Sequence, residues 1–233
     1  MPENDKFPES PQRDLASTTA GVLLNMVPVV GGSFAEIVKF VVEGPITQRK
    51  NEWFNRLGER MSKLEVKVED LKNNPKFIDA FLKASQLALQ TSQEEKLEAL
   101  KNAVINSASP ASPDAATQQM FLGKIADFNE WHIRFLDLFN YPKKWFEKNK
   151  IFTPVYFAGN GHELVGKAYG KLAPGYEFSN QIWKDLVNAG FVDGKDANFN
   201  GMPVESGGVV KMDPMLTSRI TDLGKNFLAF IKE

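Results

Sequence analysis

The sequence predicts a mostly α-helical protein, an antiparallel helical bundle followed by a small α+β module with one β-hairpin. Apolar residues recur three or four positions apart through most of residues 15–150, which is the spacing of one helix face. Proline, asparagine and serine separate these stretches, as they do at helix ends. After about residue 150, glycine and proline become frequent, and two short extended runs flank a glycine-rich turn.

The composition excludes several classes of protein. The chain has 233 residues, 42% of them hydrophobic, with 28 Lys+Arg against 29 Asp+Glu and no cysteine. It is neither a disordered polyelectrolyte, nor a collagen-like repeat, nor a disulfide scaffold. A net charge of −1 disfavours nucleic-acid binding by the whole surface. The lack of cysteine fits a reducing compartment, so we expect a cytoplasmic protein.

The first residues divide into a polar and an apolar part. Residues 1–14 are polar and rich in proline, which predicts a disordered leader. Ala16–Val42 is mostly apolar and has Glu36 and Lys39 as its only charges, and its glycines and Pro28 interrupt it too often for a membrane-spanning helix. A buried helical hairpin is the favoured interpretation, because the two charges suit one water-facing side. The alternative is a sheltered segment that inserts into a bilayer after activation.

The predicted bundle, residues 15–150, continues with two helices. Glu52–Leu71 carries a narrow apolar seam, and Asn73-Asn74-Pro75 ends it because a residue before proline disfavours the α conformation. The apolar side of the following helix carries Phe77, Phe81, Ala84 and Ala88. The seam of Glu52–Leu71 consists of Trp53, Leu57, Met61, Leu64, Val68 and Leu71.

Two further helices complete this region. Ser92 and Glu95 match a capping box, which predicts a helix start at that point. After the loop Ser107–Pro113, Ser112-Pro113 fits the N-cap and first residue of a strongly apolar helix, which Tyr141-Pro142 ends. The apolar face of that helix is predicted to hold Phe121, Ile125, Phe128, His132, Phe135, Leu136 and Phe139.

Residues 151–233 form a different predicted unit. Ser179 can cap a short helix that ends at Gly190. The extended runs Met202–Glu205 and Val209–Met212, joined by Ser206-Gly207-Gly208, predict a hairpin. Asp213-Pro214 is predicted to start a last helix, whose core stripe is Leu216, Ile220, Leu223, Phe227 and Phe230.

This order of helix, hairpin and helix resembles the winged-helix superfamily. The resemblance is carried by residues 185–192 (DLVNAGFV), the hairpin and residues 221–228 (TDLGKNFL). It covers the last quarter to third of the chain, and its motifs are short. It implies a winged-helix-like module over 151–233, with Ser179–Ala189 as recognition helix and Met202–Met212 as wing. The bundle only vaguely resembles uncharacterised bacterial helical proteins.

A DNA-binding module would need cations and base-reading side chains on those elements. The recognition helix offers Asn180, Gln181 and Lys184, and the wing offers Lys211. Residues 151–233 nevertheless hold eight Lys+Arg and nine Asp+Glu, so a basic footprint is missing. The one basic cluster, interleaved with Trp145 and Phe146, either contacts phosphates or is the solvated side of an amphipathic turn. That cluster consists of Lys143, Lys144, Lys148 and Lys150.

Ligand motifs are incomplete. Residues 161–168 nearly match a phosphate-binding P-loop, but Ala168 stands where a hydroxyl should bind Mg²⁺, which favours an ordinary helical turn. Asp196, Asn198 and Asn200 match the first ligands of a calcium loop, but Gly207 replaces the acidic twelfth residue. An Asx-rich turn is therefore favoured, and no cofactor is expected. His132, on an apolar face, is expected to be a core histidine rather than a zinc ligand.

The sequence therefore favours a non-enzymatic protein that binds another macromolecule, most readily another protein, as a bacterial regulatory or defence accessory factor. The runner-up is a DNA-binding winged-helix regulator. The third alternative is a membrane-active helical effector that uses Ala16–Val42, and self-association into a homo-oligomer stays open.

Overall fold

The computed structural model describes residues 45–61, 68–151, 160–193 and 218–232, and this part of the chain is mostly helical. Two compact units divide the chain, residues 1–52 and 53–233. In the first, α3 (Thr47–Met61) begins, and Gln48 Nε2 donates to Glu52 Oε1 at 2.8 Å. The boundary that we predicted near residue 150 falls inside the second unit.

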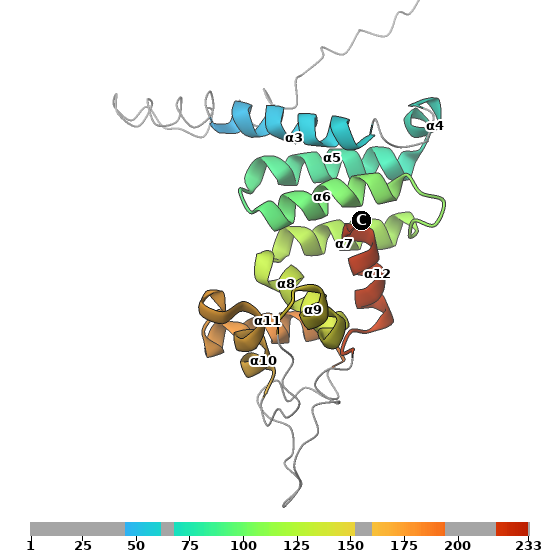
Figure 1. Ribbon diagram of the computed structural model, residues 1–233. Coiled ribbons are helices and arrows are strands. Elements are labelled where there is room, and N and C mark those ends of the chain that lie inside the picture. The colour runs from blue at the N-terminus through green and yellow to red at the C-terminus, as the bar shows by residue number, and fades with distance from the viewer. Residues whose placement is uncertain (1–44, 62–67, 152–159, 194–217, 233) are drawn as a thin grey trace, which may run out of the picture. The chain divides into compact units, whose positions relative to one another are not determined.

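Three antiparallel helices form one layer of the second unit: α5 (Pro75–Gln90), α6 (Glu94–Ser107) and α7 (Ala115–Asp127) (Figure 1). Short connections force consecutive helices to run back along each other. The predicted stop at Asn73-Asn74-Pro75 is confirmed: α4 (Val68–Lys72) ends before it, and the Asn74 side chain accepts from the Phe77 N–H. Phe77, Ala84 and Ala88 are buried as expected.

The seam predicted over Glu52–Leu71 is confirmed at Trp53, Leu57 and Leu71, which are buried. The helix that carries the first two starts earlier than predicted, at Thr47. Residues 62–67, between α3 and α4, lie outside the described part, so the predicted continuity of this helix stays a prediction. Trp53 also donates from Nε1 to Ser85 Oγ at 3.0 Å, which joins its helix to α5.

The long apolar helix predicted after residue 113 is two helices, α7 and α8 (Glu130–Asn140). The break lies at Phe128 and Asn129, which are both extended, and the Asn129 side chain accepts from the Trp131 N–H. The Asn129 N–H donates to His132 Nδ1 at 3.1 Å, which completes a capping box. His132 is buried, as expected of a core histidine, and stacks on Phe128 with ring centroids 4.4 Å apart.

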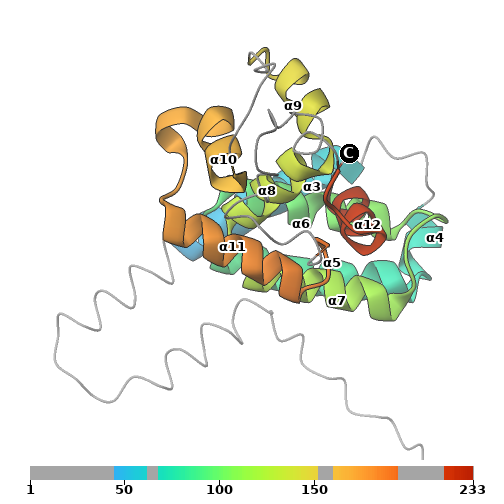
Figure 2. The same ribbon diagram turned by 90° about the horizontal axis from the view of Figure 1, so that it is seen from below.

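The remaining helices pack on α8. Tyr141-Pro142 ends α8 as predicted, and α9 (Pro142–Lys148) follows directly. Helix α10 (Gly161–Tyr169), the 3₁₀ turn η2 (Gly170–Leu172) and α11 (Tyr176–Asn188) come next, and both α10 and α11 contact α8 (Figure 2). The chain turns sharply after α11 at Gly190, whose φ of +73° favours glycine.

Helix α12 (Asp222–Ile231) returns to pack on α6 and α8. Thr221 caps it by accepting from the Gly224 N–H, so residues 218–221, which we predicted to be inside the last helix, are not helical. The predicted start at Asp213-Pro214 lies outside the described residues. Ile220 is instead paired with Val192 in an isolated antiparallel bridge. Buried aromatic rings of α12 contact those of α7 and of the turn after α11, among them Phe121, Phe191 and Phe227.

Several predicted caps are displaced by one to four residues. No side chain caps α6, whose N-cap is Gln93 instead of Ser92, and Glu95 of the predicted capping box is bound to Arg134. The N-cap of α7 is Asp114 rather than Ser112, whose hydroxyl instead accepts from Gln118 Nε2. Helix α11 begins at Tyr176, so Ser179 lies inside it, buried.

Other expectations fall on residues that the structure does not describe. They are the leader 1–14, the apolar segment 16–42 and the hairpin over residues 202–212. The described residues contain no β-strand, so the α+β character predicted for 151–233 stays a prediction. None of the helices in the described ranges has the length and apolar character needed to cross a membrane.

Candidate functional site

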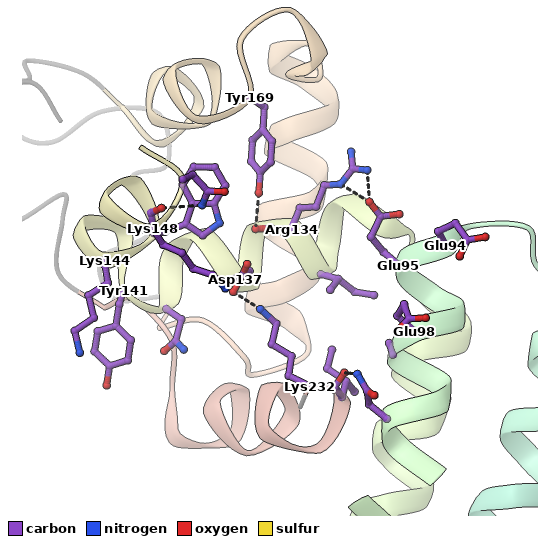
Figure 3. A pocket seen from close by; sticks show the side chains of 17 residues that line it. Glu94, Glu95, Glu98, Arg134, Asp137, Tyr141, Lys144, Lys148, Tyr169 and Lys232 are labelled. Carbon is purple, nitrogen blue, oxygen red and sulfur yellow. Dashed lines mark hydrogen bonds and ion pairs between the residues drawn. The ribbon is translucent and has the colours of Figure 1, made fainter. Parts of the chain in front are cut away.

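An open cleft of about 700 Å³ lies between α6, α8, α9 and the end of α12, with Tyr169 of α10 at its side (Figure 3). Its floor is apolar, and its two long sides are charged. The residues that line it are Glu94, Glu95, Glu98, Ala99, Asn102, Ile133, Arg134, Asp137, Asn140, Tyr141, Lys144, Trp145, Lys148, Asn149, Tyr169, Ile231 and Lys232.

The apolar floor is made by side chains that also belong to the core. Ala99, Ile133 and Ile231 are buried, and Trp145 and Tyr169 pack partly buried against them. The rings of Trp145 and Tyr169 have centroids 5.2 Å apart. The Tyr169 hydroxyl donates to the Arg134 carbonyl at 3.1 Å, and burial raises its pKa, so it stays protonated at neutral pH. The floor is thus rigid and offers aromatic surface to a ligand.

Arg134 organises the middle of the cleft. It binds Glu95 through both Nε and an Nη, and its guanidinium lies 4.7 Å from the centre of the Trp131 ring. Glu130, one helical turn before Arg134, is its second carboxylate partner at 3.4 Å. This bidentate and stacked geometry suits arginine, not lysine.

The two glutamates at Arg134 titrate differently. Burial raises the pKa of Glu95, but the hydrogen bonds from Arg134, from the backbone N–H of Glu95 and with Glu130, together with the charge of Arg134, hold that pKa below its usual value. Burial, and next the hydrogen bond with Glu95, raise the pKa of Glu130. Because a single guanidinium serves both carboxylates, the glutamate that receives its hydrogen bonds at closer range ionises more readily.

The carboxylates lining the cleft are paired with cations of the chain itself. Arg56 binds Glu94 at 2.6 and 3.1 Å, and this hydrogen bond lowers the pKa of Glu94. Lys101 binds Glu98 at 2.5 Å. Lys232 binds Asp137, and the two residues join the C-terminal end of α12 to α8. Each of these carboxylates is therefore paired, but Arg56 and Lys101 are not part of the lining, so the α6 side presents Glu94 and Glu98 to the cleft without their cations.

The lysines of α9 differ from these carboxylates. Phe146 is fully buried and Trp145 half-buried, which turns Lys143, Lys144 and Lys148 outward. Lys144 lies 4.9 Å from the centre of the Tyr141 ring. Among the residues that the structure describes, no carboxylate forms an ion pair with Lys144 or Lys148. Figure 3 shows these lysines across the cleft from the α6 glutamates.

The α12 edge of the cleft is held by two asparagines of α6. Asn106 Nδ2 lies 2.9–3.1 Å from the carbonyl oxygens of Ala229, Phe230 and Lys232. Asn102 Nδ2 donates to the Ile231 carbonyl at 3.1 Å. The last carbonyls of a helix have no partner within it, so these amides satisfy groups that would otherwise need water.

The structure separates the residues predicted to bind nucleic acid. Lys144 and Lys148 line the cleft, whereas Lys143 and Lys150 are exposed outside its lining. Lys184 is exposed on α11, where Asn180 is partly buried and Gln181 donates to Asp185 at 2.7 Å. None of these α11 residues lines the cleft. Lys211 of the predicted wing lies outside the described residues.

The described residues show no ligand site at the other candidate motifs. Gly161–Tyr169 is a helix capped by Asn160, as the non-phosphate interpretation expected. Asp196, Asn198 and Asn200 lie outside the described part of the chain. Within the described residues, no group of three His, Asp or Glu could hold a metal ion. The His132 imidazole is occupied by the α8 cap and by Asp185, whose Oδ2 lies 3.4 Å from Nε2.

Sequence reasoning missed most of the cleft. Glu95, Arg134, Asp137 and Lys232 come from three helices far apart in the chain, and no motif links them. The only signal was indirect: Arg134 and Asp137 fall on the polar side of a helix whose other side is strongly apolar. That pattern is equally typical of a solvated face.

Comparisons with known proteins gave no match: no family model, no curated protein and no solved structure is similar to this chain.

Proposed function

We propose that this protein binds another protein, and that the cleft between α6, α8 and α9 receives a short segment of that partner. The observation that supports this most is the combination of an apolar, aromatic floor with charged sides in an open groove. Ligand sites in proteins combine such apolar lining with a few placed polar groups. The carboxylates at the cleft are engaged by Arg56, Arg134, Lys101 and Lys232, which favours binding over acid–base catalysis.

The charge arrangement favours a protein segment over a nucleic acid. A nucleic-acid strand carries a negative charge at every nucleotide, so a strand lying along the cleft would bring phosphates against Glu94, Glu95 and Glu98. A peptide can place its charges at one end and neutral groups at the other. The α9 lysines alone offer too short a basic surface for a run of phosphates.

The proposal can be tested by selecting short peptides from a random display library on the full chain. Binding of selected peptides is then followed through the indole N–H signals of the four tryptophans in NMR spectra. Trp145 lines the cleft, whereas Trp53 and Trp183 are buried away from it and serve as internal controls. We expect the Trp145 signal to shift and the two control signals to stay in place.

Two outcomes would contradict the proposal. One is that no peptide is enriched, or that enriched peptides leave the Trp145 signal unmoved. The other is that single-stranded or duplex oligonucleotides shift the Trp145 signal at physiological salt, which would favour the nucleic-acid alternative. Replacing Trp145 by phenylalanine identifies its signal without removing the aromatic floor.

We further propose that residues 176–232 keep a winged-helix-like order. The support is the antiparallel bridge of Val192 with Ile220, in which the Asp193 N–H donates to the Arg219 carbonyl at 3.2 Å. The Thr221 N–H donates to the Phe191 carbonyl at 3.0 Å on the other side. These contacts bring together the two ends of residues 194–217, as a hairpin between them would require. Cytoplasmic location and a bacterial regulatory or defence role stay part of the proposal.

A further inference from the structure

We infer that the segment bound in the cleft carries a carboxylate at its α9 end, held by Lys144 and Lys148, and is neutral or basic where it passes α6. This inference rests on the proposed function and specifies the chemistry of the partner. Three observations support it: the position of Lys144 and Lys148, the cationic partners of the α6 glutamates opposite them, and the apolar floor between the two sides.

The first step is the position of the two lysines. Lys144 and Lys148 are four residues apart, so they occupy the same face of α9, and that face lines the cleft. Phe146 points the other way into the core and fixes the rotation of the helix. Both side chains line the cleft, and the Lys144 ammonium lies over the Tyr141 ring, so the α9 side of the groove offers two ammonium groups to a ligand carboxylate.

The second step is the difference in pairing between the two sides. Glu94, Glu95 and Glu98 have arginine or lysine partners, whereas Lys144 and Lys148 have no carboxylate partner among the described residues. A ligand carboxylate at α9 gains an ion pair without having to displace one. At α6 a ligand carboxylate would be repelled, and a cation there would share carboxylates that are already paired.

The third step is the floor. Ile133 and Ile231 are only 8% and 2% exposed and belong to the core, so the apolar surface that the cleft offers comes mainly from the partly buried rings of Trp145 and Tyr169. Burial of one apolar or aromatic side chain of the ligand on this floor supplies affinity, while the charges set its direction. The occupant is thus a short segment with the order acidic, apolar, then neutral or basic.

The test compares affinities of the selected peptides for two matched double variants of the full chain. Lys144→Gln with Lys148→Gln removes the cleft lysines. Lys143→Gln with Lys150→Gln removes the same charge from exposed lysines just outside the lining. We expect cleft peptides rich in Asp or Glu at one end, and a loss of roughly tenfold in affinity at low salt for the first variant only. Circular dichroism verifies that both variants stay folded.

The outcomes separate this inference from the proposed function. Peptides that shift the Trp145 signal but contain no acidic residue overturn the inference and leave protein binding in place. The same holds if both double variants lose affinity equally, since the lysines would then act only through net charge. If no peptide reaches the cleft, the proposed function itself fails.

Discussion

Gly224 of α12 lies against the backbone of Phe191, so closely that a Cβ added to it would come within 3.0 Å of the Phe191 carbonyl oxygen. The same Cβ would overlap the side chain of Ile220. The turn after α11 and the first turn of α12 are therefore packed backbone to backbone, and the Phe191 carbonyl also accepts from the Thr221 N–H. Only glycine allows this approach.

We predict that Gly224→Ala lowers the free energy of unfolding by about 2 kcal/mol or more, because the backbone of Phe191 cannot move aside as a side chain could. Gly123→Ala in α7 is the control: its Cβ would meet nothing within 4 Å. That change should be neutral or stabilise by up to about 1 kcal/mol through helix propensity. Urea denaturation measures both variants. Equal stabilities would show that the close packing of Gly224 is unimportant.

The stability of the protein should fall as the pH is lowered below 6.5, in part because of His132. Burial lowers the pKa of His132 from 6.5, despite the opposing effect of Asp185. Below pH 6.5 the unfolded chain takes up a proton that the folded chain accepts only at lower pH, so protons favour unfolding across this window. His132→Gln should flatten this dependence in urea denaturation at several pH values. Parallel curves for the wild type and His132→Gln would refute the assignment.

Arg134→Met should lower the free energy of unfolding by about 1–2 kcal/mol, since it leaves Glu95 and Glu130 facing each other without a cation. Adding Glu130→Gln should recover most of this loss, because one of the two like charges is then removed. The two free energies come from chemical denaturation at neutral pH. If the second change gives no recovery, the lost contact of Arg134 with Trp131 is the main term.

Asn106→Ala should destabilise the protein by about 1–3 kcal/mol, because it leaves carbonyl groups at the end of α12 without a donor. Asn226→Ala, at an exposed position of the same helix, is the control and should change stability by less than about 0.5 kcal/mol. Hydrogen exchange should further show faster opening of α12 in Asn106→Ala. If the amide exchange rates of α12 are the same in Asn106→Ala and the wild type, the Asn106 hydrogen bonds do not hold the end of this helix.

The sequence alone predicted the helix ends that are set by a proline. Asn74-Pro75 and Tyr141-Pro142 separate helices as predicted, because proline restricts its neighbours whatever the tertiary surroundings. Polar caps were less reliable. Ser92, Ser112 and Ser179 can each cap a helix, and none does: α6 has no side-chain cap, Asp114 caps α7, and α11 begins three residues before Ser179.

The candidate cleft could be predicted only in fragments. The basic cluster of α9 was recognised, with Trp145 and Phe146 between its lysines, but its role beside α6 was not. Periodicity also merged α7 and α8, because Phe128 and His132 keep the apolar spacing across the break. They do so because both rings pack in the same core on either side of the Asn129 cap.

The sequence by itself determined that the described chain is helical and which faces are buried, because helix periodicity and proline act over a few residues. Which distant helices meet was decided by the tertiary structure alone. Glu95, Arg134 and Lys232 become neighbours only once α6, α8 and α12 have packed. The resulting ion pairs depend on distances through space, which the local order of residues does not set. The same is true of the α9 lysines, which have no carboxylate partner in the described ranges.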